Sequence, residues 1–271
     1  MSLPRPSSDR TAVVTGASSG IGAEIARELS RRGHHVTLVA RSEDRLRALA
    51  EELAAQPSYA GSAVLPCDLG DRAARAALAD TLLAGERSVE VLVNNAGLST
   101  LGPVAASDPE AEMGMVEVDV VAVVDLCSRL LPGMVDRGRG AVLNVASTAA
   151  FQPLPGQAGY GAGKAFVLSY TQSLAGELRG TGVTATTLCP GPVHTGFGER
   201  AGFSQEDAEA ALPPVMWVSA EQVALDAVKG LDRGRLVVIP GRANRVAAAF
   251  AQVTPRSLLL PVLVRNHPGL R

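Results

Sequence analysis

Short runs of apolar, largely β-branched residues alternate along this chain with longer stretches whose apolar residues recur at helical spacing. Such alternation is typical of repeated βαβ units, in which the strands form a parallel sheet and the helices cover its faces. The pattern predicts seven strands, at residues 11–15, 35–40, 63–66, 89–94, 140–147, 183–190 and 235–240.

These elements favour an α/β fold, a Rossmann-like, doubly wound, seven-stranded and mainly parallel sheet with helices on both faces. The 271 residues, 46% of them hydrophobic, suffice for one large domain. We expect a mobile leader at residues 1–10, the fold at 11–240, and a helical, apolar extension of the same domain at 241–271.

Two helix ends are marked in the sequence. The stretch "IGAEIARELSRRG" stops at Gly33, which suits a helix C-terminus. The stretch "SEDRLRALAEELAAQ" offers Ser42 as an N-cap, with Glu43 and Asp44 in an acidic first turn.

Residues 191–217 hold Phe197, Phe203 and Trp217, although only 3% of the chain is aromatic. An excursion at the carboxyl end of a parallel strand is where open α/β sheets bind ligands. We interpret it as a substrate loop; the alternative is a variable surface loop.

The charges are balanced, with a net charge of -2 and a pI near 6.1, so no basic surface for nucleic acid is indicated. A small-molecule partner is favoured. Cys67, Cys127 and Cys189 lie far apart, in no metal-ligand spacing, and their odd number argues against a disulfide framework. We expect buried thiols in a reducing compartment and no metal site.

Neither end of the chain indicates a membrane span. The stretch "MSLPRPSSDR" has no apolar core of a signal peptide, so we expect a cytoplasmic location. The apolar segment 257–264 contains Pro261 and is far too short to cross a bilayer. A packed or oligomer-facing segment is favoured there over membrane contact.

A glycine-rich turn, "TGASSGIG", follows the first strand and leads directly into a helix. In this order the glycines permit a tight turn, close approach of a pyrophosphate and close helix packing, while the helix N-terminus attracts the anion. The turn predicts a dinucleotide site with contacts from Gly16, Ser18, Ser19, Gly20, Ile21 and Gly22.

The residue after the second strand selects the nucleotide. NAD-preferring sites place a carboxylate there for the ribose 2′-hydroxyl, whereas this chain has Arg41. A guanidinium can pair with a 2′-phosphate in forked geometry, so we predict NADP(H) over NAD(H). The alternative for Arg41 is a solvated side chain before a helix.

The pair Tyr160 and Lys164 stands out because Lys164 and Lys229 are the only lysines in the chain. With three tyrosines, chance gives about 0.02 such Tyr-x-x-x-Lys matches. Residues i and i+4 share a helix face, and a nearby ammonium favours the phenolate, which suits a general acid/base.

Together with "NNAG" at 94–97, Ser147 at thirteen residues before Tyr160, and "CPGPVHT" at 189–195, these motifs resemble classical members of the short-chain dehydrogenase/reductase family. The resemblance covers roughly residues 11–240. It implies that Tyr160 exchanges a proton with the substrate oxygen as hydride moves, that Ser147 donates a hydrogen bond to that oxygen, and that Lys164 also reaches the nicotinamide ribose. Alternatively, Ser147 caps a local turn.

The resemblance implies further cofactor contacts. Asp68 would bond the adenine and Thr195 the carboxamide; alternatively, Asp68 caps a loop and Thr195 begins a helix. The full implied set is Asp68, Leu69, Asn94, Ala96, Gly97, Tyr160, Lys164, Pro190, Gly191, Val193 and Thr195.

One position departs from the family pattern. Many members carry an asparagine on the helix before the fifth strand, where this chain has Asp119. Asp119 either holds a relay water as an amide would, or it has another partner. Its charge would raise the pKa of Lys164.

We expect an NADP(H)-dependent carbonyl reductase or alcohol dehydrogenase for a mainly apolar substrate. Alternatives within the family are a 3-oxoacyl thioester reductase and a steroid or polyketide ketoreductase. Outside it, a non-catalytic NADP(H)-sensing protein or a membrane-surface protein would fit. The resemblance implies a homotetramer or homodimer built on the helix after Asp119 and the helix of Tyr160, where Gly161, Gly163 and Ala165 would permit close approach.

Overall fold

The computed structural model describes residues 3–200, 202, 212–266 and 270. Its seven strands form one sheet in the order β3-β2-β1-β4-β5-β6-β7, and every neighbouring pair is parallel. The predicted strands are thus confirmed, although the last is only two residues long. The strands are β1 (Arg10–Thr15), β2 (Val36–Ala40), β3 (Ser62–Pro66), β4 (Ser88–Asn94), β5 (Gly140–Val145), β6 (Val183–Leu188) and β7 (Val237–Val238).

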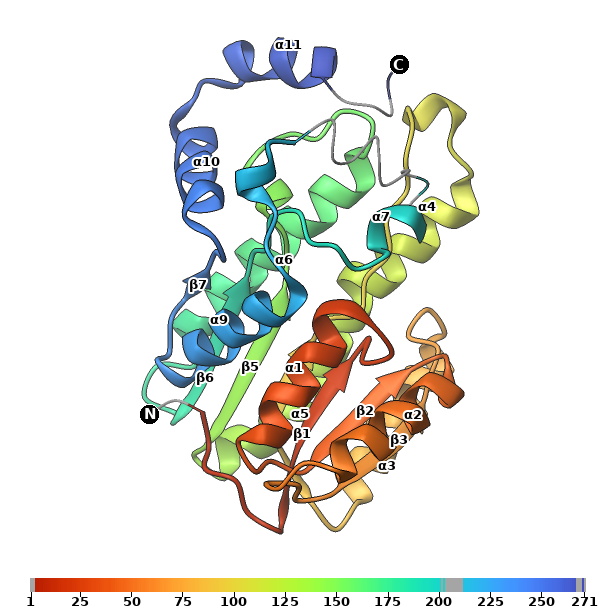
Figure 1. The fold of residues 1–271 in the computed structure, drawn as a ribbon, viewed down its shortest axis with the longest axis vertical. Helices are drawn as coiled ribbons and strands as arrows, with labels where there is room; N and C mark the ends of the chain where they lie inside the picture. Colours follow the sequence, from red (N-terminus) through yellow and green to blue (C-terminus); the bar gives the residue numbers. More distant parts are fainter. Residues whose placement is uncertain (1–2, 201, 203–211, 267–269, 271) are drawn as a thin grey trace.

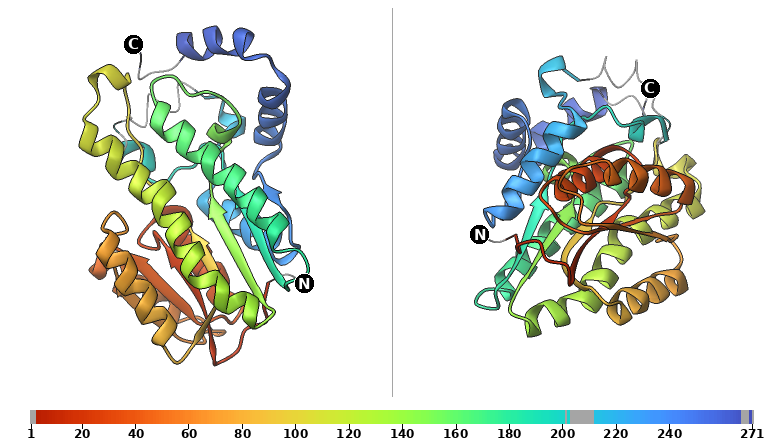
Figure 2. Two further views of the ribbon diagram at one scale, coloured as in Figure 1. Left: turned by 180° about the vertical axis from the view of Figure 1, so that it is seen from behind. Right: turned by 60° about the horizontal axis from the view of Figure 1, so that its bottom comes forward.

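Helices cover both faces of the sheet, as expected (Figures 1 and 2). On one face α1 (Gly20–Arg31), α2 (Glu43–Ala54) and α9 (Ala220–Asp232) bury their apolar stripes. On the other face lie α3 (Arg72–Ala84), α5 (Ala122–Asp136) and α6 (Ala158–Glu177). Because both faces are covered, the central strands β2 and β5 are buried along their whole length.

The two marked helix ends lie where the sequence predicts them. Helix α1 ends at Arg31, and Gly33 follows in the left-handed region with φ 83°. Helix α2 begins at Glu43 with Ser42 at the N-cap, although the serine hydroxyl makes no capping hydrogen bond there. The acidic first turn of Glu43 and Asp44 therefore favours this helix start through the helix dipole.

The chain reverses its direction across the sheet between β1 and β4, because β2 and β3 lie on one side of β1 and β5 to β7 lie beyond β4. At such a switch point the loops after the two strands diverge and leave a crevice at their carboxyl ends. The glycine-rich turn follows β1 and the "NNAG" stretch follows β4. The fold therefore brings the two motifs together at one edge of the sheet.

Shorter elements connect the strands to these helices. The 3-10 turn η1 (Val104–Ala106), helix α4 (Pro109–Val116) and the π turn η2 (Glu117–Val121) precede α5, and η3 (Thr148–Phe151) follows β5. In the substrate loop, α7 (Phe197–Arg200) and η4 (Pro214–Met216) are described, whereas Phe203 lies outside the described residues. The C-terminal extension forms α10 (Arg242–Val253) and α11 (Arg256–Asn266).

Part of the expected leader is packed against the domain. The Leu3 side chain is buried in the core cluster formed with α1. Cys67, Cys127 and Cys189 are buried and free of disulfides, as the sequence predicts. Within the described part of the chain, no helix is long and apolar enough to cross a membrane.

Candidate active site

The glycine turn after β1 is closed by contacts that exclude side chains. Gly16 has φ 65°, and a Cβ there would lie 2.7 Å from Asn95 Nδ2. A Cβ on Gly22 would lie 2.4 Å from both that nitrogen and the Gly16 carbonyl oxygen. The glycines thus allow the first turn of α1 to approach the loop after β4, which leaves the backbone of the turn as its main surface.

Two residues that the sequence analysis did not single out hold this turn. The Thr15 hydroxyl donates to Val93 O at 3.2 Å and accepts from the backbone amides of Asn95 and Ala96 at 2.9 and 3.1 Å. The Asn95 side chain donates to Thr15 O at 3.0 Å. Thr15 lies in the "TGASSGIG" motif and Asn95 in the "NNAG" motif, so their position within these motifs could have indicated their roles.

Asn94, expected to line the cofactor channel, points elsewhere. Its side chain is buried and donates to Asn144 Oδ1 at 2.9 Å and to Cys127 Sγ at 3.4 Å. The correction has a simple cause, because successive residues at a strand end face opposite sides of the sheet. Asn95, not Asn94, directs its side chain to the glycine turn.

The segment after β6 returns to the same turn. A Cβ on Gly20, which has φ 56°, would lie 2.9 Å from Thr195 Cβ, so the predicted carboxamide contact lies against the glycine turn. Pro190 is buried and its carbonyl accepts from Thr148 N at 2.8 Å. Val193 packs on the core cluster that includes α1.

Contacts at both ends hold the substrate loop. Val218 N donates to Pro192 O at 3.2 Å, and the His194 and Trp217 rings stack with centroids 4.2 Å apart. The Asn244 side chain donates to Met216 O at 2.9 Å and fills the space beside Gly191, where a Cβ would lie 2.4 Å from its oxygen. This asparagine from α10 was not predicted, because nothing in the local sequence links it to the loop.

At the adenine end, Arg41 is exposed directly after β2 and forms no ion pair with any residue in the described parts of the chain. Asp68 is also exposed and accepts from Gly70 N at 2.9 Å, which is the loop-capping alternative. Leu69 has a buried side chain, and its carbonyl accepts from Arg75. These positions place an exposed guanidinium at the end of β2, beside the strand that the glycine turn follows.

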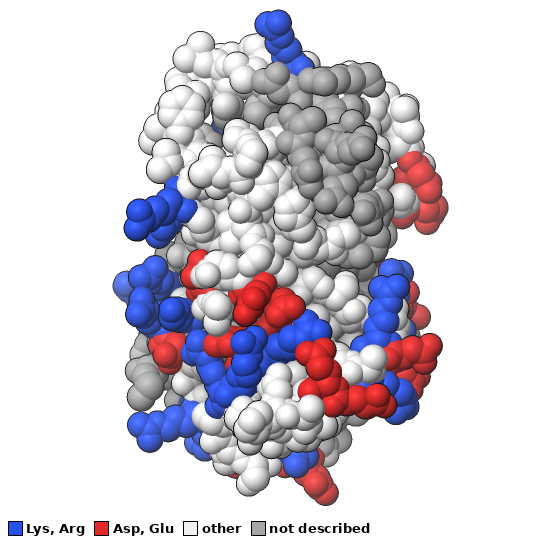
Figure 3. All heavy atoms as spheres, viewed as in Figure 1, with Lys and Arg blue, Asp and Glu red and all other residues white. Residues whose placement is uncertain are grey.

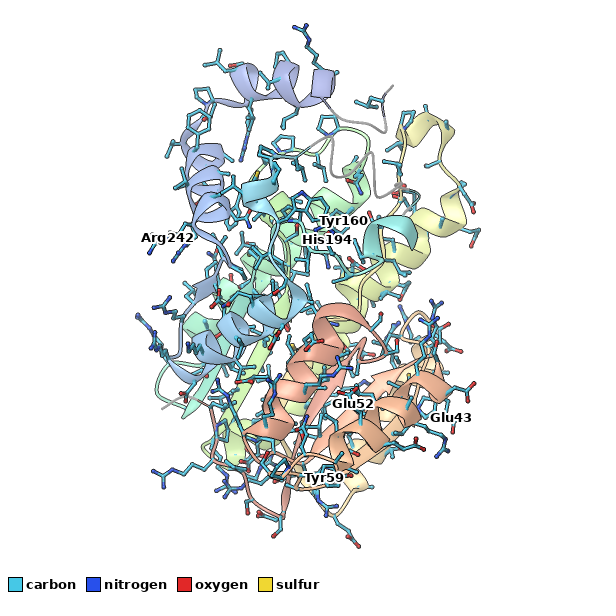
Figure 4. All side chains as sticks on the ribbon, in the orientation of Figure 1. Glu43, Glu52, Tyr59, Tyr160, His194 and Arg242 are labelled. Atoms are coloured by element: carbon cyan, nitrogen blue, oxygen red, sulfur yellow. The ribbon has the colours of Figure 1, made fainter. Side chains whose placement is uncertain are left out.

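Tyr160 and Lys164 lie on the first turns of α6, with Lys164 Nζ 5.6 Å from the Tyr160 ring centroid. The Tyr160 ring also contacts Phe197 of the substrate loop, with centroids 5.9 Å apart. In Figure 4, Tyr160 and His194 both lie beyond the carboxyl ends of the strands. The predicted pair therefore lies at the carboxyl ends of the strands, where Lys164 donates to the carbonyl of Val145, the last residue of β5.

The glycines near Tyr160 and Lys164 pack closely against residues of the same chain. A Cβ on Gly161 would lie 2.9 Å from Leu154 Cβ, and one on Gly163 would lie 3.4 Å from Val120 Cγ2. The expectation that these two glycines face a partner subunit is therefore wrong, because both are buried against the same chain. Ala165 is exposed.

Ser147 follows β5 and caps η3, where its hydroxyl oxygen accepts from Ala149 N at 3.1 Å. Ser147 thus caps the turn as the alternative predicts, with one lone pair of its hydroxyl oxygen. The hydroxyl proton remains available, and a hydrogen bond from Ser147 favours the ionised form of Tyr160. Ser147 therefore lies within hydrogen-bond reach of the tyrosine oxygen. The hydrogen bond to the substrate oxygen that the resemblance implies stays a prediction.

Asp119 has Lys164 itself as its partner. Lys164 Nζ lies 2.9 Å from Asp119 Oδ2, and both side chains are almost fully buried, with 5% and 2% exposed. Asp119 Oδ1 accepts from Leu98 N at 2.7 Å, and Lys164 also donates to Val145 O at 3.3 Å. The π turn η2 carries Asp119 into this position; such turns recur at functional sites.

Gly97 completes this arrangement. A Cβ there would lie 3.2 Å from Lys164 Nζ and 3.4 Å from each Asp119 carboxylate oxygen. The predicted cofactor-site glycine therefore lies directly beside the buried ion pair. An alanine at position 97 would require the ammonium group to shift by a few tenths of an ångström.

The charges in this cluster set the pKa values of its members. Burial raises the pKa of Tyr160 above its usual value near 10, while Lys164 and Ser147 lower it and Asp119 raises it further. Burial lowers the pKa of Lys164, but the attraction of Asp119 and Tyr160 prevails and the pKa is raised, as expected from the sequence. Lys164 therefore stays cationic and Tyr160 keeps its proton at neutral pH.

The family described as short chain dehydrogenase matches residues 10–205, the part of the chain that builds this site. The chain belongs to the short-chain dehydrogenase family. Sulfoacetaldehyde reductase 2 of Chromohalobacter salexigens is 38% identical to this short-chain dehydrogenase, over 78% of this chain and 84% of that protein. The NADP-dependent 3-hydroxy acid dehydrogenase of Salmonella typhi is 36% identical, over 76% of this chain and 88% of that protein.

A solved structure agrees with these relatives. A short-chain dehydrogenase from Sphingobium yanoikuyae in complex with NADPH is similar with a TM-score of 0.79 and 34% identity, over 93% of this chain and 95% of that one. The chain is thus an oxidoreductase of this family. Its described residues fit a dinucleotide, because Gly16, Gly20 and Gly22 leave no room for side chains and so expose the backbone at the start of α1 as the surface for a pyrophosphate.

Proposed function

We propose that this short-chain dehydrogenase is an NADP(H)-dependent oxidoreductase that interconverts a ketone and a secondary alcohol on a mainly apolar substrate. The observation that carries the proposal is the convergence of Ser147, Tyr160 and the Lys164–Asp119 pair beside the glycine turn. A bound nicotinamide would supply or accept the hydride. The remaining chemistry falls to the side chains of this chain.

Tyr160 is the general acid for reduction and the general base for alcohol oxidation. Its raised pKa keeps the proton on the phenol oxygen until a substrate oxygen needs it. Ser147 accepts from Ala149 N through its oxygen, which leaves its hydroxyl proton to turn from Tyr160 to a substrate oxygen and stabilise the developing negative charge. Both groups thus act on the same oxygen.

Lys164 positions and charges the site without exchanging the substrate proton itself. Its ammonium is fixed by Asp119 and by Val145 O, and it lies close enough to Tyr160 to stabilise the phenolate form. The third donor of the ammonium remains for the nicotinamide ribose hydroxyls, which the compact, rotatable group of lysine suits. Asp119 anchors that ammonium.

The preference for NADP(H) is supported by Arg41. Its guanidinium is exposed at the end of β2 and unpaired within the described part of the chain, so it is available to a 2′-phosphate. The name of the Salmonella relative and the NADPH in the Sphingobium structure accord with this choice. We assign the remaining predicted contacts, Asp68 and Thr195, to the two ends of the same cofactor.

An apolar substrate is supported by the aromatic ring beside the reactive tyrosine. Phe197 contacts Tyr160, and Trp217 lies at the other end of the same loop. The names of the two relatives point to small acidic substrates instead, a sulfonated aldehyde and a 3-hydroxy acid. A 3-oxoacyl compound is therefore the second candidate.

Oligomer and location complete the proposal. Helices α5 and α6 border a groove of about 500 Å³ lined by Leu131, Val135, Tyr170 and Leu174 among others, and Phe166 beside it is 43% exposed. This face supports the dimer or tetramer that the family resemblance implies. We place the protein in the cytoplasm.

The test is NADPH oxidation with a panel of bulky ketones, 3-oxoacyl thioesters, 3-oxo acids and sulfoacetaldehyde, followed for the wild type and for Tyr160→Phe. We expect turnover of a ketone and a loss of about 10²-fold to 10⁴-fold in kcat for the variant, with NADPH binding by fluorescence titration retained. An active Tyr160→Phe protein would refute the mechanism. NADPH binding without turnover of any carbonyl would favour a sensing protein.

A further inference from the structure

The outward face of α10 carries apolar side chains that no other described residue covers. Its Asn244, Ala248 and Ala251 face inward and are buried, whereas Val246, Phe250 and Val253 are 70%, 64% and 78% exposed. These three apolar residues are spaced at i, i+4 and i+7 and form one stripe. A protein surface in water rarely keeps such a stripe without a partner.

Helix α11 extends this stripe. Among the residues of α11 whose burial is described, Leu259 alone has a buried side chain, while Leu258, Val262 and Val264 are exposed by about half or more. Arg256 at its start donates to Phe151 O through both terminal nitrogens at 3.1 Å, which ties the helix to η3. In Figure 1, α11 lies at the end of the molecule, beyond the carboxyl ends of the strands. The outward sides of α10 and α11 are called the C-terminal surface below.

The charges of the C-terminal surface all have one sign. Its two helices carry Arg242, Arg245, Arg256 and Arg265, and no Asp or Glu occurs anywhere in the chain after Asp232. Figure 4 shows Arg242 directed away from the body of the protein. In Figure 3 red and blue side chains crowd together over the lower half, whereas the part that holds α10 and α11 shows blue groups separated by uncharged atoms.

We propose that the C-terminal surface docks on an anionic lipid bilayer. An apolar helix face flanked by basic residues alone lies in the interface of such a bilayer, with the apolar side chains below the headgroups and the cations among the phosphates. A second copy of this chain meets only the first requirement. A two-fold pairing of this surface with a second copy would bring arginines against arginines without a carboxylate on either side.

Docking would bring the reaction site close to the bilayer. Helix α10 lies against η4, at the end of the substrate loop, and Asn244 binds that loop directly. Arg256 binds the turn that Ser147 caps. The docked surface is thus joined to both walls of the site, and an apolar substrate would reach it from the membrane. The docking itself does not depend on the proposed reaction.

The test is flotation of the full-length protein with vesicles of phosphatidylcholine alone or of equal parts phosphatidylcholine and phosphatidylglycerol. We expect binding to the anionic vesicles only, falling between about 0.1 M and about 1 M salt. The double change Phe250→Ser and Val253→Ser should weaken it by at least about tenfold. Replacing Arg242 and Arg245 by Ala should weaken it by about fivefold for each arginine removed.

Two exposed positions away from this surface provide matched controls, Leu83→Ser on α3 and Arg179→Ala after α6. They should leave vesicle binding unchanged, and circular dichroism with thermal melting should show all variants folded. Equal binding of wild type and the double serine variant, or no binding to anionic vesicles, would overturn the proposal. So would a sedimentation profile in which the double serine variant loses a subunit contact while vesicle binding is absent.

Discussion

Asp119→Asn removes the negative charge of the Lys164–Asp119 pair but keeps a side chain of nearly the same shape. The amide keeps an oxygen for the Leu98 amide at 2.7 Å, but Lys164 loses its counter-ion at 2.9 Å. At an effective dielectric constant of about 20, two unit charges at that separation attract by about 6 kcal/mol. Removing one partner of a buried pair usually costs about 3–5 kcal/mol, because the remaining charge is buried without compensation.

We therefore expect the free energy of unfolding to fall by about 3 kcal/mol and the melting temperature by roughly 6 °C. Turnover should persist, because the amide can still hold the loop after β4. The pH dependence of the rate should shift. Asp119 raises the pKa of Tyr160, so its neutralisation lowers that pKa, and the rate of alcohol oxidation should rise at lower pH than in the wild type.

The same pKa shifts determine how the free energy of unfolding depends on pH. The pKa values of Tyr160 and Lys164 are raised in the folded protein, so their contribution is present below the usual values of 10.0 and 10.5 and is lost as the pH rises through the folded values. The variant should lose part of this dependence. Asp125→Asn is the control, since Asp125 pairs with Arg75 and Arg129 away from Tyr160 and should change melting but not the pH–rate profile.

An unchanged pH–rate profile for Asp119→Asn would refute the inference that this carboxylate acts on Tyr160. A collapse of kcat at every pH would show instead that the carboxylate takes a direct part in proton transfer. Initial rates with saturating NADP⁺ and alcohol, together with thermal melts, distinguish the outcomes.

Three further changes test other parts of the site. Arg41→Asp should raise the KM for NADPH by about tenfold to hundredfold and leave that for NADH nearly unchanged, because charge-assisted bonds to the 2′-phosphate are lost; equal effects on both would contradict the NADP assignment. Gly97→Ala should lower kcat by about tenfold, because its Cβ would lie 3.2 Å from Lys164 Nζ. The control Gly176→Ala, which has open space around the added Cβ, should leave kcat unchanged. Equal kcat values for the two variants would show that the ammonium can shift without loss of activity. Asn244→Ala should raise the KM for the carbonyl substrate more than that for NADPH, because Asn244 binds Met216 O in the substrate loop. An unchanged substrate KM would show that α10 has no influence on substrate binding.

The sheet could be predicted because its strands are buried on both faces. Runs such as "HVTLVA" and "GAVLNVAS" are β-branched and continuous, which distinguishes them from the helical stretches around them. Ser147, Tyr160 and Lys164 could be predicted because the relevant spacings are local, one within a helix and one across a short connection.

Other features depend on contacts that no local pattern encodes. The roles of Asn94 and Asn95 were exchanged, since which of two adjacent asparagines faces the glycine turn depends on the register of β4. The pairing of Asp119 with Lys164 depends on a π turn that shifts the phase of the helix, and helical spacing alone does not reveal it. The partners of Gly161 and Gly163 are likewise set by how η2 and the 152–157 segment pack on α6.

The burial of Lys164 leaves this enzyme with a single accessible lysine side chain. Lys229 is exposed on α9, whereas Lys164 is ion-paired and enclosed. Amine-reactive dyes, crosslinkers or resins should therefore attach to the protein's lysines at Lys229 alone, on the opposite face of the sheet from α5 and α6. Lysine-directed attachment would thus occur at one position and leave the reactive tyrosine and its neighbours untouched.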